Sequence, residues 1–201
     1  MDIEQQVVRA WNNVRQMLED RGHEVAGAPG DLEVAALAGE NGTFGVTAAE
    51  GVRVVFHVSQ QSTKLKQEVF AAAGEARHAV LVLNTRTSGS AGASKPNNTT
   101  VKSLEQEARL KEMGLEIWTL KETQYNVTRH ALVPRHVKLE PDEAEGVLEQ
   151  LCVKNRYLLP AISHTDPVSR YLLLTPGDIV RIERPSPTAG QAVVYRCCRR
   201  G

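Results

Sequence analysis

The sequence has few cysteines, and their arrangement excludes two kinds of stabilised fold. Three cysteines in 201 residues, two of them adjacent, cannot form the paired framework of a disulfide-rich secreted domain. Cys197 and Cys198 would point to opposite faces of a strand, and no histidine lies at zinc-ligand spacing from a cysteine. We therefore expect structural thiols, no metal and no cofactor.

The chain also lacks an excess of charge and a long apolar run. Its 24 basic side chains balance 24 acidic ones, so any contact with DNA must be local. The longest apolar runs hold about six residues, far below the roughly 20 of a membrane helix, and an amphipathic pattern stands where a signal peptide would begin. With 41% hydrophobic residues the chain can bury a core, so we expect an intracellular globular protein of one or two domains, without a membrane partner.

Hydrophobic periodicity predicts an α/β arrangement in the first part of the chain. Apolar residues at three- and four-residue spacing predict helices, and short apolar runs predict strands. The predicted helices cover residues 3–18, ended by Gly22, 62–74, capped by Ser62, and 101–113, ended by Gly114. The predicted strands cover residues 52–58, 79–83 and 115–120. We expect residues 25–47 to be mostly irregular and residues 85–100 to form a mobile surface loop.

The second part of the chain has a different pattern. A helix is predicted from Glu140 to Leu151, and a second one begins after Asp166, its cap, with Pro167 in the first turn. Two strands, 178–183 and 191–197, follow. Residues 1–128 carry 13 basic and 16 acidic side chains, a net of −3, whereas residues 129–201 carry 11 and 8, a net of +3. We expect two domains with this boundary: an α/β domain with a mixed sheet and a small α+β domain.

Three catalytic interpretations lack the residues that they require. The stretch Ser88–Gly92 is not the G-x-S-x-G turn of a serine hydrolase, and it has no apolar anchor to hold a nucleophile. Lys95 lies between Ser94 and Pro96, whereas a P-loop needs Gly before the lysine and Ser or Thr after it. The central strands offer no converging carboxylates for the metal ions of a nuclease. We expect no small-molecule substrate.

The last two predicted strands are joined by a stretch that favours docking. In RIERPSPTAG, Arg181–Gly190, Pro185 and Pro187 fix backbone angles, while Ser186, Thr188 and backbone groups offer hydrogen bonds to another chain. Gly190 allows a tight return into the last strand. A loop that is ordered before binding loses less entropy on binding, which predicts a prearranged docking element.

Three motifs in the second part carry a family resemblance. They are HALVPRHVKL at 130–139, LLPAISHTDPVSRY at 158–171 and PGDIVRIERPSPTAGQAVVYR at 176–196. In order and spacing they resemble the fifth-largest subunit of eukaryotic RNA polymerases, whose archaeal relative consists of just this portion. Asp20-Arg21-Gly22, with the α/β order after it, resembles the amino-terminal jaw domain of the eukaryotic subunit more weakly. The resemblance implies a noncatalytic polymerase subunit in the nucleus, or in a viral transcription compartment and virion. Its second domain would dock on the largest subunit, and its jaw would lie beside downstream DNA.

The resemblance and the docking stretch together select the candidate site residues. The partner-docking set is Arg170, Tyr171, Arg184, Pro185, Ser186, Thr188, Gly190, Tyr195 and Arg196. For Arg170, pairing with Asp166 is an alternative, and for Tyr171 a place in the core is the alternative. The residues expected near DNA phosphates, without reading sequence, are Arg86, Lys95 and Lys102.

Two positions depart from the family pattern, and one other function stays open. Leu173 stands where the family usually has the glycine that ends a helix, so we expect that helix to end differently, because leucine disfavours positive φ. Ala161 replaces a usual basic residue and removes one polar contact. The alternative function is a free-standing interaction module that binds a transcription regulator or a chaperone.

Overall fold

The chain folds as two units, each with its own sheet. A computed structural model describes residues 2–25, 30, 33–34, 42–58, 64–84, 98–186 and 190–200. Unit 1 is Met1–Tyr125 and unit 2 is Asn126–Gly201. Each unit combines helices with a four-stranded mixed sheet, which confirms the predicted mixed fold class. No helix in these described stretches is long and apolar enough to cross a membrane.

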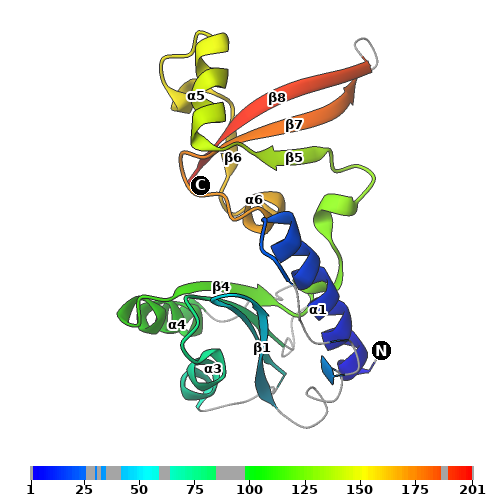
Figure 1. Cartoon of the computed structure of the whole chain (residues 1–201), viewed down its shortest axis with the longest axis vertical. Coiled ribbons are helices and arrows are strands. Elements are labelled where there is room, and N and C mark those ends of the chain that lie inside the picture. Colours follow the sequence, from blue (N-terminus) through cyan, green and yellow to red (C-terminus); the bar gives the residue numbers. More distant parts are fainter. Residues whose placement is uncertain are drawn as a thin grey trace. The chain divides into compact units, whose positions relative to one another are not determined.

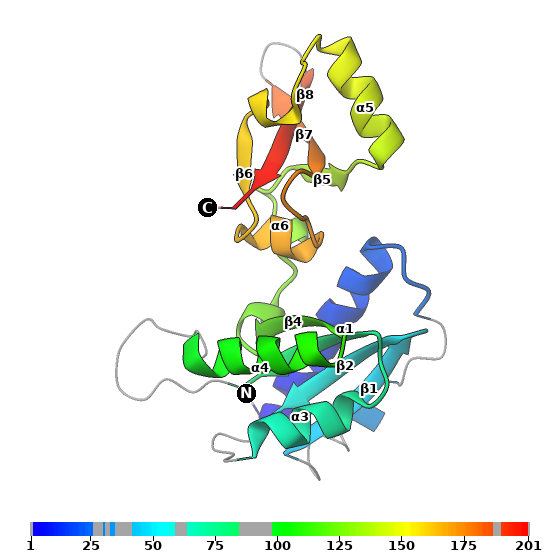
Figure 2. The same cartoon turned by 90° about the vertical axis from the view of Figure 1, so that its left-hand side faces the viewer.

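Unit 1 has a sheet between two layers of helices. In chain order its elements are α1 Ile3–Asp20, β1 Thr43–Ala49, β2 Val52–His57, α3 Leu65–Ala73, β3 His78–Leu83, α4 Asn98–Leu110, β4 Gly114–Thr119 and η1 Glu122–Gln124. The sheet order is β1-β2-β3-β4, with β1 antiparallel to β2 and the other neighbours parallel. Figures 1 and 2 show α3 and α4 on one face of this sheet and α1 on the other. Three of its strands and its three long helices lie where the sequence predicts them, within a few residues.

The core of unit 1 follows from two apolar periods. Along α1 the apolar spacing gathers one buried stripe, which consists of Val7, Ala10, Trp11, Val14, Met17 and Leu18. The parallel strands β2 and β3 are buried on both faces, as expected for strands with helices on both sides. Val55, Leu81 and Leu83 pack with Phe70 of α3 and Leu104 of α4 in one cluster. The sheet is therefore sealed by the helices of its own unit.

The strand β1 is not predicted, because its residues 43–47 belong to the segment 25–47, which we expect to be mostly irregular. Its sequence, TFGVTAA, is poor in the β-branched runs that signal a strand, yet it pairs with β2 through a tight turn at Gly51, whose φ is +72°. Gly45 in β1 has a clear reason: a Cβ there would collide with the carbonyl of Ala72 in α3. A small residue in β1 thus allows the helix α3 to pack closely on the strand. Because small residues do not favour strands, the sequence does not predict this one.

Unit 2 is the smaller unit and combines its sheet with two α-helices. In chain order its elements are η2 Val127–Arg129, β5 Arg135–Lys138, α5 Pro141–Gln150, η3 Arg156–Leu158, β6 Ala161–Ser163, α6 Pro167–Tyr171, β7 Ile179–Ser186 and β8 Gly190–Arg199. The sheet order is β5-β7-β8-β6, and only β6 runs parallel to its neighbour β8. Asp166 caps α6, because its Oδ1 accepts a hydrogen bond from the N–H of Val168 at 2.9 Å, with Pro167 in the first turn as predicted.

The two adjacent cysteines divide the core of unit 2 into two clusters. Cys197 packs with Ile179 on the face of the sheet that α5 covers, and Cys198 packs with Val180 on the opposite face. Both thiols are free and buried, and burial raises the pKa of each. They are structural thiols on opposite faces of a strand, as the sequence predicts.

The strands β7 and β8 form a longer hairpin than the sequence predicts. Arg184, Pro185 and Ser186, expected in the loop, continue β7 and pair with Ala192, Gln191 and Gly190. Strand β5 pairs with β7 only as far as Glu183, so the hairpin beyond it is a two-stranded ribbon. Figure 1 shows this ribbon extending past the rest of unit 2.

Pro185 is tolerated in β7 because its nitrogen faces the free edge. The carbonyl of Ile179 accepts a hydrogen bond from Leu139 at 3.0 Å, on the side of β7 that faces β5. Backbone groups of alternate residues point to the same side of a strand, so those of Pro185 also point away from β8. No ladder bond is lost there, as is typical of proline at a sheet edge.

Four helices end in the same left-handed turn, and only one of them uses glycine for it. After α1 the residue with positive φ is Gly22, whereas after α4, α5 and α6 it is Glu112, Cys152 and Leu173. After α6, Leu173 donates to the carbonyl of Arg170 at 3.1 Å and Leu174 donates to Ser169 at 2.9 Å, which is the Schellman pattern. The expectation that Leu173 would close the helix differently is wrong: the turn keeps its geometry and leucine accepts the strain. Likewise, α4 turns at Glu112 and Gly114 already belongs to β4.

Candidate docking surface

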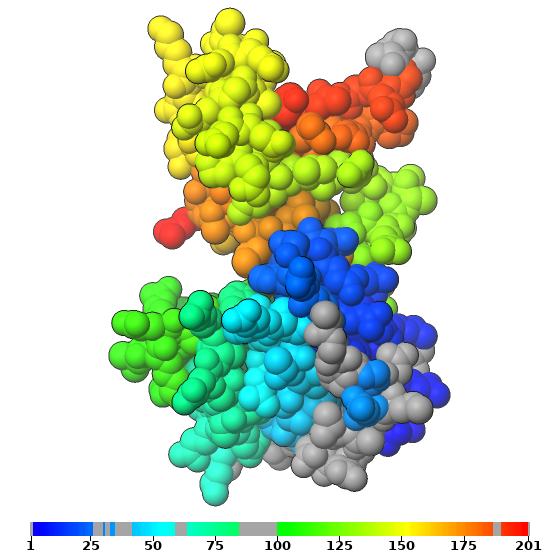
Figure 3. All heavy atoms as spheres, viewed as in Figure 1, coloured from blue at the N-terminus to red at the C-terminus, as the bar shows by residue number. Residues whose placement is uncertain are grey.

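The ribbon of β7 and β8 presents several of the predicted docking residues to solvent. Arg184 and Pro185 are exposed, and Ser186 is half-buried. Gly190 is exposed with φ of +70°, and a Cβ there would meet no atom, so conformation and not crowding requires glycine. Thr188 lies outside the described residues. Figure 3 shows the orange-to-red atoms of this ribbon standing clear of the yellow atoms of α5.

Two other predicted docking residues serve the interior of unit 2. Tyr171 is 5% exposed, and its hydroxyl oxygen accepts a hydrogen bond from Asn126 Nδ2 at 2.9 Å. Tyr195 is half-buried and packs against the cluster under α5. The core alternative therefore holds for Tyr171. Arg170 lies half-buried in the last turn of α6.

Arginine side chains fix the segment before β6 by binding backbone carbonyls. Arg196, a predicted docking residue, is exposed and donates to the carbonyl of Ala161, the first residue of β6, at 3.0 Å. Arg199 donates to the carbonyls of Leu159, at 2.8 Å, and of Tyr157. Sequence reasoning missed these bonds, although the arginines that flank the buried cysteine pair were a signal. They stiffen a backbone that has no long strand to hold it.

The stiffened segment carries exposed apolar side chains. Leu158 is 72% exposed and Tyr157 is 49% exposed, and both belong to η3 directly before β6. Pro160 and Ala161 beside them are exposed too. Large apolar side chains held in place on a surface are typical of a protein interface. The segment is a second candidate for contact with another chain.

Asp178 is a titratable group of unit 2 with a structural role. Partial burial raises the pKa of Asp178, but hydrogen bonds from Lys138 and Thr175 and the charge of Lys138 outweigh it, so the pKa is lowered. Lys138 Nζ lies 2.8 Å from Asp178 Oδ2, which ties β5 to the start of β7. Among the described residues no group of histidine, cysteine and carboxylate side chains could hold a metal ion.

Unit 1 contains a partly buried ionic cluster that sequence reasoning missed. Arg21 binds both oxygens of Glu116, at 2.7 and 2.9 Å, and His78 Nε2 lies 2.6 Å from Glu116 Oε1. Trp118 Nε1 donates to the same carboxylate at 3.3 Å. Burial raises the pKa of Glu116, but hydrogen bonds from His78 and Arg21 and their charges outweigh it and lower the pKa to about 2. The cluster joins the end of α1 to the first residue of β3 and to the interior of β4.

Of the three residues predicted near DNA, the described part of the chain includes one. Lys102 is exposed on α4, and the same helix also exposes Glu105 and Arg109. Among the described residues of α4, the charge around Lys102 is therefore mixed. Arg86 and Lys95 lie outside the described residues.

Comparison with known proteins gives consistent matches to polymerase subunits. Residues 125–198 match the family "RNA polymerase Rpb5, C-terminal domain". The chain is 46% identical over 77 residues to DNA-directed RNA polymerase subunit Rpo5 of Thermofilum pendens, covering 38% of this chain and 95% of that protein. It is 41% identical over 88 residues to DNA-directed RNA polymerases I, II, and III subunit rpabc1 of Dictyostelium discoideum, covering 44% of each chain. The chain thus matches nearly all of the archaeal protein and less than half the length of the eukaryotic one.

Proposed function

The chain belongs to the Rpb5 family of DNA-directed RNA polymerase subunits, and on this basis we propose that it is a noncatalytic subunit that docks on the largest subunit through unit 2. Unit 1 then lies as a jaw beside downstream DNA. As a member of the family the chain takes part in transcription and associates with other polymerase subunits. If the chain comes from a eukaryotic cell, its compartment is the nucleus, since the eukaryotic relatives are subunits of DNA-directed RNA polymerases. If the chain comes from a virus, it belongs to the viral transcription compartment and the virion.

The observation that carries the docking proposal is the free ribbon at the end of the β7–β8 hairpin. Arg184 and Pro185 are exposed on it, and its backbone is ordered by pairing with β8 before any partner binds. Ordering before binding reduces the entropy lost on association. Arg184 supplies a guanidinium, whose planar fork suits bidentate contact with a carboxylate or backbone carbonyls. The docking set then comprises Arg184, Pro185, Ser186, Thr188, Gly190 and Arg196, with Arg170 at the end of α6.

The exposed apolar segment before β6 supports the same proposal. Tyr157 is an anchor of the type that dominates interface energetics, and Leu158 beside it adds exposed apolar surface. Arginine bonds to the carbonyls of Tyr157 and Leu159 hold their backbone. Unit 2 thereby offers an apolar contact and a polar one. A large partner subunit can cover both.

A charge reversal on the ribbon tests the docking proposal. We expect Arg184→Glu to reduce copurification with the two largest polymerase subunits about tenfold, since like or unpaired charges at an interface weaken association strongly. The matched control is Arg129→Glu, which changes the charge of another exposed arginine of unit 2. Circular dichroism should show both variants folded. Equal recovery of the largest subunits with Arg184→Glu and with the control would exclude the ribbon as a docking element.

The jaw role implies a weak contact with DNA that does not read sequence. Arg86, Lys95 and Lys102 can meet phosphates, and three such contacts give a slope of about −3 in a plot of log affinity against log salt concentration. Feeble binding is expected for the isolated chain, measured by fluorescence anisotropy with a labelled duplex. Tight binding to one sequence at physiological salt would show that the positioning role is wrong.

A further inference from the structure

Unit 2 has an acidic side, although residues 129–201 carry a net positive charge. Of the eight acidic residues in this part of the sequence, five lie between 140 and 149, and no basic residue lies between 139 and 153. This acidic stretch is the helix α5 with the residue before it. The helix therefore presents a charge opposite to that of the arginines on the ribbon and near β6.

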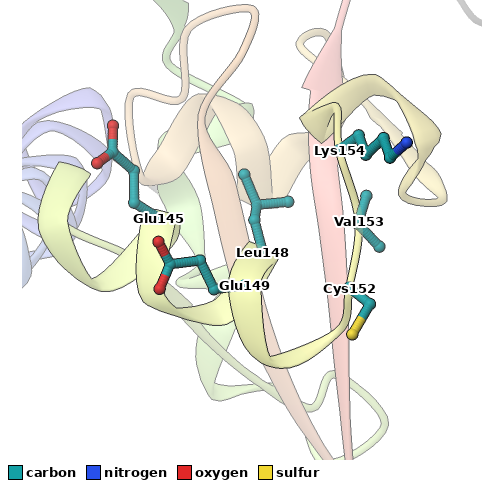
Figure 4. Close-up of a pocket in the computed structure, with 6 residues that line it drawn as sticks. All are labelled: Glu145, Leu148, Glu149, Cys152, Val153 and Lys154. Carbon is teal, nitrogen blue, oxygen red and sulfur yellow. The ribbon is translucent and has the colours of Figure 1, made fainter.

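The end of α5 and the segment after it form a hollow that is open to solvent. Its volume is about 460 Å³, and it is lined by Glu145, Leu148, Glu149, Cys152, Val153 and Lys154. Figure 4 shows the two carboxylates on the helix side, with Leu148 and Val153 between them and Lys154. Leu148 and Val153 are half-buried against the core, so they give the hollow an apolar floor, and Leu151 beside it is 45% exposed.

The positions of Glu145 and Glu149 do not favour the helix itself. They are four residues apart and repel one another, and Glu149 lies in the last turn, where the helix dipole disfavours an acid and no basic residue offsets it. Asp142 and Glu143, in contrast, lie in the first turn, where acids are favourable. Neither Glu145 nor Glu149 forms an ion pair with any residue that the structure describes. Their charge is available to a cation from outside.

We propose that this hollow binds a basic amphipathic segment of another protein in the assembled polymerase. An apolar side chain of that segment covers Leu148 and Val153, and a lysine or arginine reaches Glu145 and Glu149. The charge of α5 disfavours nucleic acid and acidic peptides, and a second copy presenting α5 would bring like charges together. Lys154 at the other side of the hollow limits the cationic contact to the helix side.

Cys152 permits a direct test, because it is the exposed one of the chain's three cysteines. The subunit is labelled at Cys152 with a benzophenone maleimide and incorporated into purified polymerase. The complex is then irradiated, and the cross-linked peptide is identified by mass spectrometry. The expected product joins Cys152 to a segment of another polypeptide in which lysine or arginine lies within about one helical turn of a large apolar residue.

Charge variants decide whether the carboxylates hold the segment. Per molecule of incorporated subunit, Glu145→Lys with Glu149→Lys should lower the cross-linking yield about tenfold. The matched control, Asp142→Lys with Glu143→Lys, makes the same change on the same helix outside the hollow and should keep the yield within about twofold. An equal loss in both variants, a cross-linked segment without basic residues, or no cross-link in the assembled enzyme would overturn the proposal. Normalising to incorporated subunit separates this result from failure of the ribbon to dock.

Discussion

The two units differ in how much apolar surface they leave uncovered. Among the described residues, six of the eight exposed large hydrophobic side chains belong to unit 2, although it is the smaller unit: Leu132, Leu151, Tyr157, Leu158, Leu173 and Val193. Unit 1 exposes only Leu110 and Tyr125 among its described residues. Unit 1 closes its sheet with its own helices and an internal ionic cluster, whereas unit 2 leaves a ribbon and an apolar segment open. On the docking proposal, the uncovered apolar surface of unit 2 is the surface that a partner would cover.

The largest effect is expected when the charge of Glu116 is removed from the ionic cluster of unit 1. Glu116→Gln leaves the guanidinium of Arg21, whose side chain is 5% exposed, without its buried counter-charge. We expect unit 1 to lose about 4 kcal/mol of unfolding free energy, because breaking a buried ion pair from one side leaves an uncompensated charge. Denaturant unfolding followed by tryptophan fluorescence measures this, since both tryptophans, Trp11 and Trp118, belong to unit 1.

A surface pair provides the control for this variant. Glu19→Gln removes the negative charge from the ion pair between Arg15 Nε and Glu19, which are 3.6 Å apart and both well exposed. Its loss should cost less than about 1 kcal/mol. If the two variants were equally stable, the cluster would not be what holds α1 to the sheet.

Acid should weaken unit 1 through the same carboxylate. The folded-state pKa of Glu116 is about 2, below its ordinary value of 4.5, so the stabilisation is fully present above about pH 4.5 and is lost as the pH falls toward 2. The shift corresponds to about 3 kcal/mol. Tryptophan-detected unfolding between pH 6 and pH 2 should show a steep decline for the natural protein and a flatter one for Glu116→Gln. Parallel curves would assign the acid sensitivity to other groups.

The smallest of these effects is expected at the helix ends of the two units. Gly22→Leu in unit 1 places a side chain at φ of +85°, and Leu173→Gly in unit 2 relieves one at +51°. We expect the first change to destabilise by about 1 kcal/mol and the second to stabilise by up to about 1 kcal/mol, less the added freedom of glycine in the unfolded chain. Thermal unfolding by circular dichroism would show the two shifts. Destabilisation by Leu173→Gly would mean that contacts of the leucine outweigh its strain.

Local patterns predict most helices and strands, because apolar spacing alone determines which face of an element is buried. The spacing in α1 and the apolar run in β3 are examples. The strand β1 is not predicted from its sequence. Gly45 is needed there because Ala72 of α3 packs closely against it, and only the fold brings these two residues together. The turn at Leu173 escapes prediction for a similar reason: the tertiary contacts of the chain on both sides impose a conformation that leucine would not choose.

The candidate site is predicted in part for comparable reasons. The exposed residues of the ribbon follow from turn residues between two strands, and the structure extends the strand through Arg184 and Ser186. The bonds of Arg199 to carbonyls and of Arg21 to Glu116 join residues about 40 and 95 positions apart, and no local pattern encodes such a distance. The burial of Tyr171 depends on packing in the same way.

The position of Pro185 has a consequence for the newly made subunit before it meets its partners. An unpaired edge strand can form hydrogen bonds with a strand of a neighbouring molecule, and this is a common route to aggregation. A residue without an N–H at that margin interrupts the hydrogen-bonding template while leaving the side of β7 that faces β8 intact. Before the subunit assembles, Pro185 thus opposes strand pairing between the ribbons of two copies.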